Sequence, residues 1–88
     1  MLIPRRHVAD WFEMKTVEHQ AVLDLATAAR RLLIREHAPD GFNLGVNIGE
    51  AAGQTIFHVH LHLIPRYRDD VPNPRGGVRG VIPAKQSY

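Results

Sequence analysis

The most restrictive feature of this 88-residue sequence is a run of alternating histidines, His-Val-His-Leu-His-Leu-Ile at positions 58–64. In an extended strand, successive side chains point to opposite faces of the sheet. One face would carry three imidazoles: His58, His60 and His62. The other face would be apolar and would pack into the core: Phe57, Val59, Leu61 and Leu63. The run therefore predicts a strand with one buried face and one face suited to chemistry at neutral pH, where imidazole titrates.

The length allows one small domain, residues 1–88, with a modest core. A hydrophobic content of 44% is typical of a folded chain. The absence of cysteine excludes disulfides, thiolate zinc sites and a catalytic thiol. No apolar run is long enough to cross a membrane, and the N-terminus carries no signal-peptide pattern. We therefore expect a cytoplasmic protein without a membrane partner.

The charge distribution argues against a nucleic-acid partner. The formal net charge is only +2 at pH 7, and the arginines are dispersed along the chain rather than gathered in one block: Arg5, Arg6, Arg30, Arg31, Arg66, Arg68, Arg75 and Arg79. This pattern suits local contacts with phosphate groups better than a continuous basic surface.

Hydrophobic periodicity predicts an α+β fold in which one long helix covers an antiparallel sheet. A helix is expected over residues 17–37, with Thr16 as its N-cap. Its residues with three-to-four spacing form one apolar stripe: Ala21, Leu25, Ala28, Ala29 and Leu32. Strands are expected over 42–48 and 55–64, joined as a hairpin.

The boundaries of the second strand and of the C-terminal segment follow from proline and glycine. Pro65 is expected to end the histidine-bearing strand. Residues 68–88, which are rich in proline and glycine and lack any sustained period, are predicted to form an extended tail that packs on the body of the domain or on a partner.

The histidine face is compatible with two kinds of chemistry. Side chains two residues apart on a strand lie roughly 6–7 Å from each other, which suits a metal site and also phosphate chemistry in which one imidazole attacks. The preceding loop favours phosphate, because Gly49 and Gly53 let the backbone approach an anion closely. Asn47, Gln54 and Thr55 add amide and hydroxyl donors suited to a phosphoryl group.

These segments together resemble the histidine triad (HIT) superfamily. The run at 58–64 has that family's His-φ-His-φ-His-φ-φ pattern, where φ is hydrophobic. Further likeness lies in Gly53-Gln54-Thr55, in Ile3-Pro4-Arg5-Arg6-His7-Val8, and in residues 41–50, which are similar to bacterial members of the diadenosine tetraphosphate hydrolase type. The resemblance covers nearly the whole chain and implies a HIT-like antiparallel sheet with one long helix.

The resemblance implies a catalytic role for each histidine. His60 would attack the α-phosphorus of a nucleotide and form a covalent nucleotidyl-histidine. His62 would donate to the phosphate or the leaving group, and His58 would be structural and would orient His60. A carbonyl that accepts a hydrogen bond from one ring nitrogen of His60 would fix the reactive tautomer. The implied activity is that of a nucleotide hydrolase or nucleotidyl transferase.

The resemblance also implies the binding residues. Gly53, Gln54 and Thr55 would form the phosphate-binding loop, and Asn47 would line the same pocket. The reaction requires no metal or other cofactor, and a dinucleoside polyphosphate would be a suitable substrate.

Two departures from the family pattern bear on these expectations. Family members usually carry a longer segment before the Pro-Arg-Arg-His motif, so the domain resembles an N-terminally truncated HIT domain. Some relatives hold zinc with a Cys-x-x-Cys pair and two histidines; the equivalents of those histidines here are His7 and His58, and without cysteines no zinc is expected.

A shortened sheet leaves an exposed edge strand, which favours a homodimer, with strand exchange as one route. Two alternatives to an enzyme are a non-catalytic nucleotide-binding or interaction fragment, and a metal-binding strand.

Overall fold

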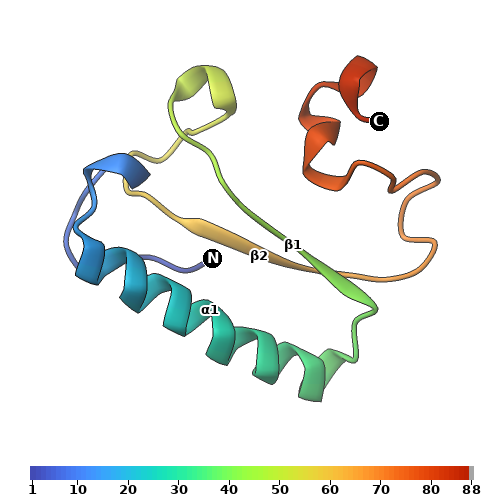
Figure 1. Ribbon diagram of the computed structural model, residues 1–88, viewed down its shortest axis with the longest axis horizontal. Coiled ribbons are helices and arrows are strands. Elements are labelled where there is room, and N and C mark those ends of the chain that lie inside the picture. Colours follow the sequence, from blue (N-terminus) through green and yellow to red (C-terminus); the bar gives the residue numbers. More distant parts are fainter. Residues whose placement is uncertain (88) are drawn as a thin grey trace.

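One long helix and a two-stranded antiparallel hairpin form the framework of the computed structural model, which describes residues 1–87 (Figure 1). The elements in chain order are η1 (Trp11–Glu13), α1 (Thr16–His37), β1 (Gly41–Val46), η2 (Glu50–Ala52), β2 (Leu61–Arg66), η3 (Gly77–Val81) and η4 (Pro83–Lys85), where η denotes a 3-10 helix. The predicted α+β class is confirmed. None of the helices within the described residues combines the length and apolarity that a membrane crossing requires.

The hairpin is shorter than the sequence predicts, and Pro65 lies within a strand. The register pairs Gly41 with Arg66 and Val46 with Leu61, so that Pro65 faces Phe42 inside β2. A proline lacks the N–H group that a central strand needs, but it is tolerated at a sheet edge. Beyond β1, the part of the chain that the structure describes adds to β2 only an isolated bridge at Leu61, so β2 is an edge at Pro65.

The expected strand over 55–64 begins only at Leu61, because the N-terminal segment takes over the preceding residues. Leu61 exchanges two backbone hydrogen bonds with Leu2, at 2.9 and 2.8 Å, and the Val59 N–H donates to the Val8 carbonyl at 2.7 Å. Residues 55–60 are therefore held by contacts with residues 2–8 rather than by β1.

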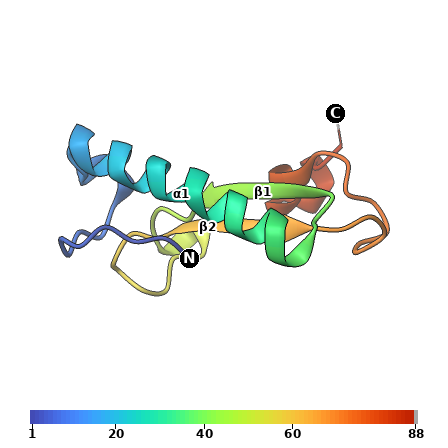
Figure 2. The same ribbon diagram turned by 90° about the horizontal axis from the view of Figure 1, so that it is seen from below.

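The core lies between α1 and the hairpin. Its buried members come from the N-terminal segment, the helix and the histidine-bearing segment: Val8, Met14, Val22, Ala26, Val59 and Leu61. The predicted burial of Val59 and Leu61 is confirmed, but Phe57 is 52% exposed because it precedes the extended stretch. The helix turns Val22 and Ala26 inward, whereas Leu25 and Leu32 of the predicted stripe are exposed. Figure 2 shows α1 running obliquely across the hairpin.

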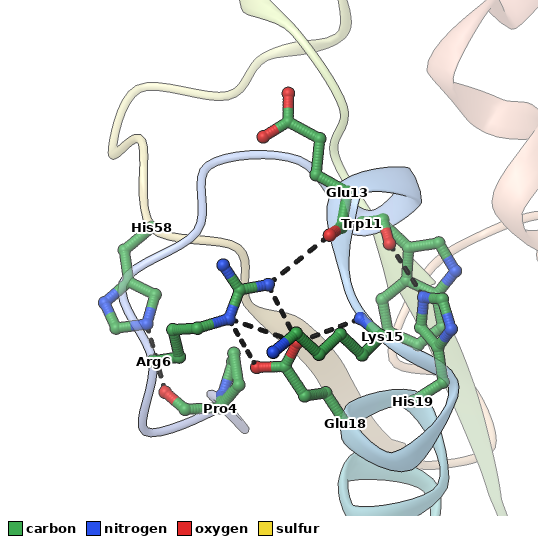
Figure 3. A network of polar contacts seen from close by, with 8 residues as sticks. All are labelled: Pro4, Arg6, Trp11, Glu13, Lys15, Glu18, His19 and His58. Carbon is green, nitrogen blue, oxygen red and sulfur yellow. Dashed lines mark hydrogen bonds and ion pairs between the residues drawn. The ribbon is translucent and has the colours of Figure 1, made fainter.

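The start of α1 is tied to the N-terminal segment. Lys15, rather than the predicted Thr16, is the N-cap, and its N–H donates to the Glu18 carboxylate at 2.9 Å. Arg6 reaches the same carboxylate through Nη2 at 2.8 Å and Nε at 3.0 Å (Figure 3). Hydrogen bonding to Arg6, reinforced by the Lys15 N–H, lowers the pKa of Glu18 to about 2. Thr16 is displaced as cap because the carboxylate of Glu18 already satisfies the helix start.

The Arg6–Glu18 contact predicts an acid-dependent loss of stability. Since the pKa of Glu18 is lowered on folding from 4.5 to about 2, its stabilising effect is fully present above about pH 4.5 and is lost as the pH falls toward 2. We expect Glu18→Gln to lower the urea midpoint at neutral pH, and the difference from the unmodified protein to vanish near pH 2. Glu36→Gln, at the other end of α1, is the control. A difference that persists at pH 2 would contradict the assignment.

The C-terminal segment is folded, in contrast to the predicted extended tail over 68–88. Left-handed Gly76 (φ 91°) precedes η3, and Gly77 (φ 54°) begins it, whereas η4 follows Ile82. The segment lies on the side of the hairpin opposite α1 (Figure 1), and η3 packs against β1. Periodicity does not reveal such a segment, because its short turns depend on glycine conformation and on contacts with β1. Tyr88 lies outside the described residues.

Candidate active site

The backbone determines which nitrogen of His60 is reactive. Nδ1 of His60 lies 2.9 Å from the carbonyl oxygen of His58. A carbonyl oxygen only accepts, so Nδ1 carries a proton, and in the neutral ring the lone pair is then on Nε2. The expected carbonyl contact is thus confirmed. His60 is partly buried, which limits the orientations of the ring.

His58 connects this arrangement to the N-terminal segment. Its Nε2 lies 3.1 Å from the carbonyl oxygen of Pro4 (Figure 3). Its ring also meets that of His7 edge-on, with centroids 5.0 Å apart. The Pro4 carbonyl can only accept, so Nε2 of His58 is the protonated nitrogen. The ring of His58 therefore holds its own peptide in place, and the carbonyl of that peptide orients His60.

His62 is the histidine that faces open space. Its ring lies edge-to-face with that of His60, at a centroid distance of 4.9 Å. It stands opposite Gly45 in the hairpin register. A side chain at Gly45 would meet no atom within 4 Å, so the glycine leaves room beside His62 rather than forming a bulge. The structure therefore brings His60 and His62 together on the face opposite the core.

The loop before the histidines has the backbone geometry that the sequence predicts. Gly49 (φ 87°) and Gly53 (φ 91°) are both left-handed and flank η2. Such φ angles strain any residue with a side chain, and this explains why glycine occupies both positions.

Gln54 has a different function from the one expected. Its side chain is only 3% exposed. Its Oε1 accepts from the Gly49 N–H at 2.9 Å, while Nε2 donates to the carbonyls of Ala9, at 2.7 Å, and Ile56, at 3.2 Å. Both amide protons are used inside the protein, so the predicted phosphate contact by this amide is wrong. Gln54 instead fastens the loop to the N-terminal segment.

Asn47 lines the same cavity as His62, and Thr55 follows the loop in sequence. Thr55 is exposed immediately after Gln54. Asn47 follows β1 and is partly buried, and its Nδ2 lies 3.8 Å from the position that a Cβ on Gly53 would occupy. Both side chains keep hydrogen-bonding groups near the loop.

A half-open cavity of about 1070 Å³ adjoins His62. Its walls are strand β1 with Asn47, two residues of η2, two residues of β2, and the segment 77–82 without Arg79. The η2 and β2 residues are Ala51, Ala52, His62 and Ile64. Within the described chain its lining contains no Lys, Arg, Asp or Glu. Asn43 lies on the same face of β1 as Gly45 and was not among the site residues expected from the sequence. Its even spacing from Asn47, which puts the two side chains on one face of an extended chain, could have revealed it.

The resemblance relates His7 and His58 to two zinc-binding histidines of some relatives, but these two residues do not make a complete set of zinc ligands. His7 and His58 lie in ring contact. Among residues 1–87, no group of three or more His, Cys, Asp or Glu side chains is placed to hold a metal ion.

Comparison with solved structures shows a shared fold. A HIT family protein from Bacillus anthracis superposes with a TM-score of 0.71 and 43% sequence identity, covering 74% of this chain and 46% of that protein.

Sequence comparison identifies the same family. The HIT domain family model matches residues 1–69. An uncharacterized HIT-like protein of Mycoplasma genitalium is 39% identical over 67 residues, 76% of this chain and 48% of the relative. The AP-4-A phosphorylase of Mycobacterium tuberculosis is 31% identical over 71 residues, 80% of this chain and 36% of that enzyme. The chain thus spans half or less of the length of these relatives. With its histidine pattern, fold and sequence in agreement, the chain belongs to the HIT family.

Proposed function

We propose that the protein is a nucleotide hydrolase or nucleotidyl transferase that acts at an α-phosphate through His60. The observation that carries this proposal is the hydrogen bond between Nδ1 of His60 and the His58 carbonyl. It leaves Nε2 as an unprotonated nucleophile on the open face. A nucleophile whose tautomer and orientation are already set avoids the cost of arranging them during the reaction.

The first step would exchange one phosphorus bond for another. Nε2 of His60 attacks the α-phosphorus, the N–P bond forms, and the bond from phosphorus to the leaving oxygen breaks. The electron pair departs with that oxygen, which takes a proton that His62 can donate. Water, or another acceptor, then attacks phosphorus and releases the nucleotide from His60.

Neighbouring groups would stabilise the charge on the transferring phosphoryl group. Thr55 offers a hydroxyl and Asn47 an amide beside the glycine loop, and positioned donors of this kind account for most of the catalysis in phosphoryl transfer. This chemistry needs no metal. The likeness to an AP-4-A phosphorylase supports a dinucleoside polyphosphate as substrate.

Detection of the covalent intermediate tests the proposal. The protein is mixed with diadenosine tetraphosphate, quenched without acid, and analysed by intact-mass and peptide mass spectrometry. We expect an increase equal to one adenylyl group on the peptide that contains His60. Nucleotide binding measured by calorimetry, with neither adduct nor turnover, would instead favour the alternative of a non-catalytic nucleotide-binding fragment.

We also propose that the protein forms a homodimer through its unpaired strand edges, with or without strand exchange. Within residues 1–87, β1 pairs only with β2, and exposed strand edges favour pairing with a second chain. Sedimentation velocity over a range of protein concentrations tests this, and a monomer throughout would contradict it.

A further inference from the structure

The C-terminal segment forms a wall of the cavity beside His62, although the family match ends before it. The HIT model covers residues 1–69, whereas the outer wall of the cavity is the segment 77–82. Figure 1 shows this segment on the same side of the hairpin as the loop that carries η2. The wall therefore lies beyond the residues that the family model matches.

This wall presents apolar side chains to open space. Val81 is 83% exposed, Val78 57% and Ile82 54%, and Ile64 of β2 is 47% exposed across the cavity. A cluster of exposed aliphatic groups around one hollow is typical of a ligand site, because a ligand that covers them removes apolar surface from water.

The polar groups of the cavity are amides rather than charges. Arg66 donates to Oδ1 of Asn43, and Nδ2 is the hydrogen-bond donor that this amide offers to a ligand. Asn47 provides a second amide near His62. A polyphosphate chain needs cations or dense donors, which the lining lacks. Aliphatic walls with two amides suit a flat, uncharged heteroaromatic ring whose edge accepts hydrogen bonds.

The wall is held in place by internal contacts. The side-chain amide of Gln86 donates to the carbonyls of Asn73, at 3.0 Å, and Arg75, at 3.1 Å. A Cβ on Gly76 would come within 1.8 Å of the Gln86 carbonyl oxygen, so the backbone closes tightly at that point. The Arg66–Asp70 ion pair, at 2.7 Å, fixes the chain where it leaves β2. These contacts make segment 77–82 a preformed surface.

From this arrangement we infer that the cavity binds the nucleobase of the leaving group, the second nucleoside of a dinucleotide substrate. The inference rests on the proposed reaction at His60. The leaving group departs on the side where His62 can protonate it, and His62 lines this cavity. The volume of about 1070 Å³ is at the upper end of the range for small-molecule sites.

Two substrates that differ only in the second nucleoside test the inference. We expect kcat/KM for diadenosine tetraphosphate to exceed that for adenosine 5′-tetraphosphate about tenfold, because the second base covers part of the aliphatic walls and removes apolar surface from water. Gly45→Val, which fills the cavity floor beside His62, should bring this ratio close to one. Gly41→Val is the matched control, since Gly41 lies on the same face of β1 but outside the cavity, and both positions have space for a side chain. A ratio near one in the unmodified protein would overturn the inference.

A binding measurement keeps the test independent of turnover and of the folding of the variants. Methyl NMR of the unmodified protein follows Val78, Val81 and Ile82 during titration with diadenosine tetraphosphate, and we expect these signals to shift. If they stay in place at millimolar dinucleotide, the cavity assignment is wrong, whether or not His60 becomes adenylylated. If they shift but no adduct forms, the proposed reaction fails and the binding site stands.

Discussion

Replacing His60 with glutamine should abolish the adenylyl–enzyme and reduce turnover by more than about 10⁴-fold, because removal of a covalent nucleophile can cost about 10⁶-fold in kcat. Glutamine keeps a polar side chain of similar length but cannot attack phosphorus to form a competent intermediate. The effect should be on kcat, because the loop, Thr55 and Asn47 would still hold the substrate. Intact-mass spectrometry and steady-state kinetics with diadenosine tetraphosphate measure both quantities.

Two further substitutions make this result specific. His62→Gln should slow turnover by about 10²-fold, since it removes a proton donor but not the nucleophile. His37→Gln, at the exposed C-terminal end of α1, should leave turnover unchanged. An adduct that persists in His60→Gln, or that maps to the ring of His62, would refute the assignment of the nucleophile.

Replacing Gln54 with leucine should lower the free energy of unfolding by about 3 kcal/mol, because it leaves three backbone groups around the buried side chain without their hydrogen-bond partner. Those groups are the Gly49 N–H and the carbonyls of Ala9 and Ile56. Urea unfolding followed by the fluorescence of Trp11, the single tryptophan, measures the change. In a domain of this size, such a loss is a large part of the total stability.

Gln20 provides the matched control for Gln54. It is exposed and donates one hydrogen bond to Asp24 within α1, so Gln20→Leu should change stability by no more than about 0.5 kcal/mol. Gln54→Glu tests whether residue 54 must donate hydrogen bonds. Its carboxylate would face two carbonyl oxygens, and protonation would restore one donor, so this variant should gain stability relative to wild type as the pH falls. Equal effects of the leucine substitutions at 54 and 20 would refute the structural role of Gln54.

The side-chain pattern near the histidines was predictable because it depends on local geometry. Alternation along an extended chain places Val59 and Leu61 in the core and leaves His60 and His62 on the other face, whatever the chain pairs with. The same reasoning found the long helix, whose ends agree within one residue with the predicted range, and the two left-handed glycines of the loop. The family resemblance, carried by these local patterns, was confirmed.

Other features depend on contacts between distant residues, and no local pattern encodes them. His58 meets the carbonyl of Pro4 across 54 positions, and Gln54 meets that of Ala9 across 45. These contacts replaced the expected first half of the second strand and turned an expected phosphate ligand into a support for the loop.

One physical reason separates the features that the sequence predicts from those that only the tertiary structure decides. Chain geometry within a few residues decides which way each side chain points, so the amino-acid order alone determined the histidine face, the apolar face and the family. Free energy of packing decides which distant groups meet, so only the tertiary structure decided that residues 2–8 hold the histidine segment and that segment 77–82 closes a cavity beside His62.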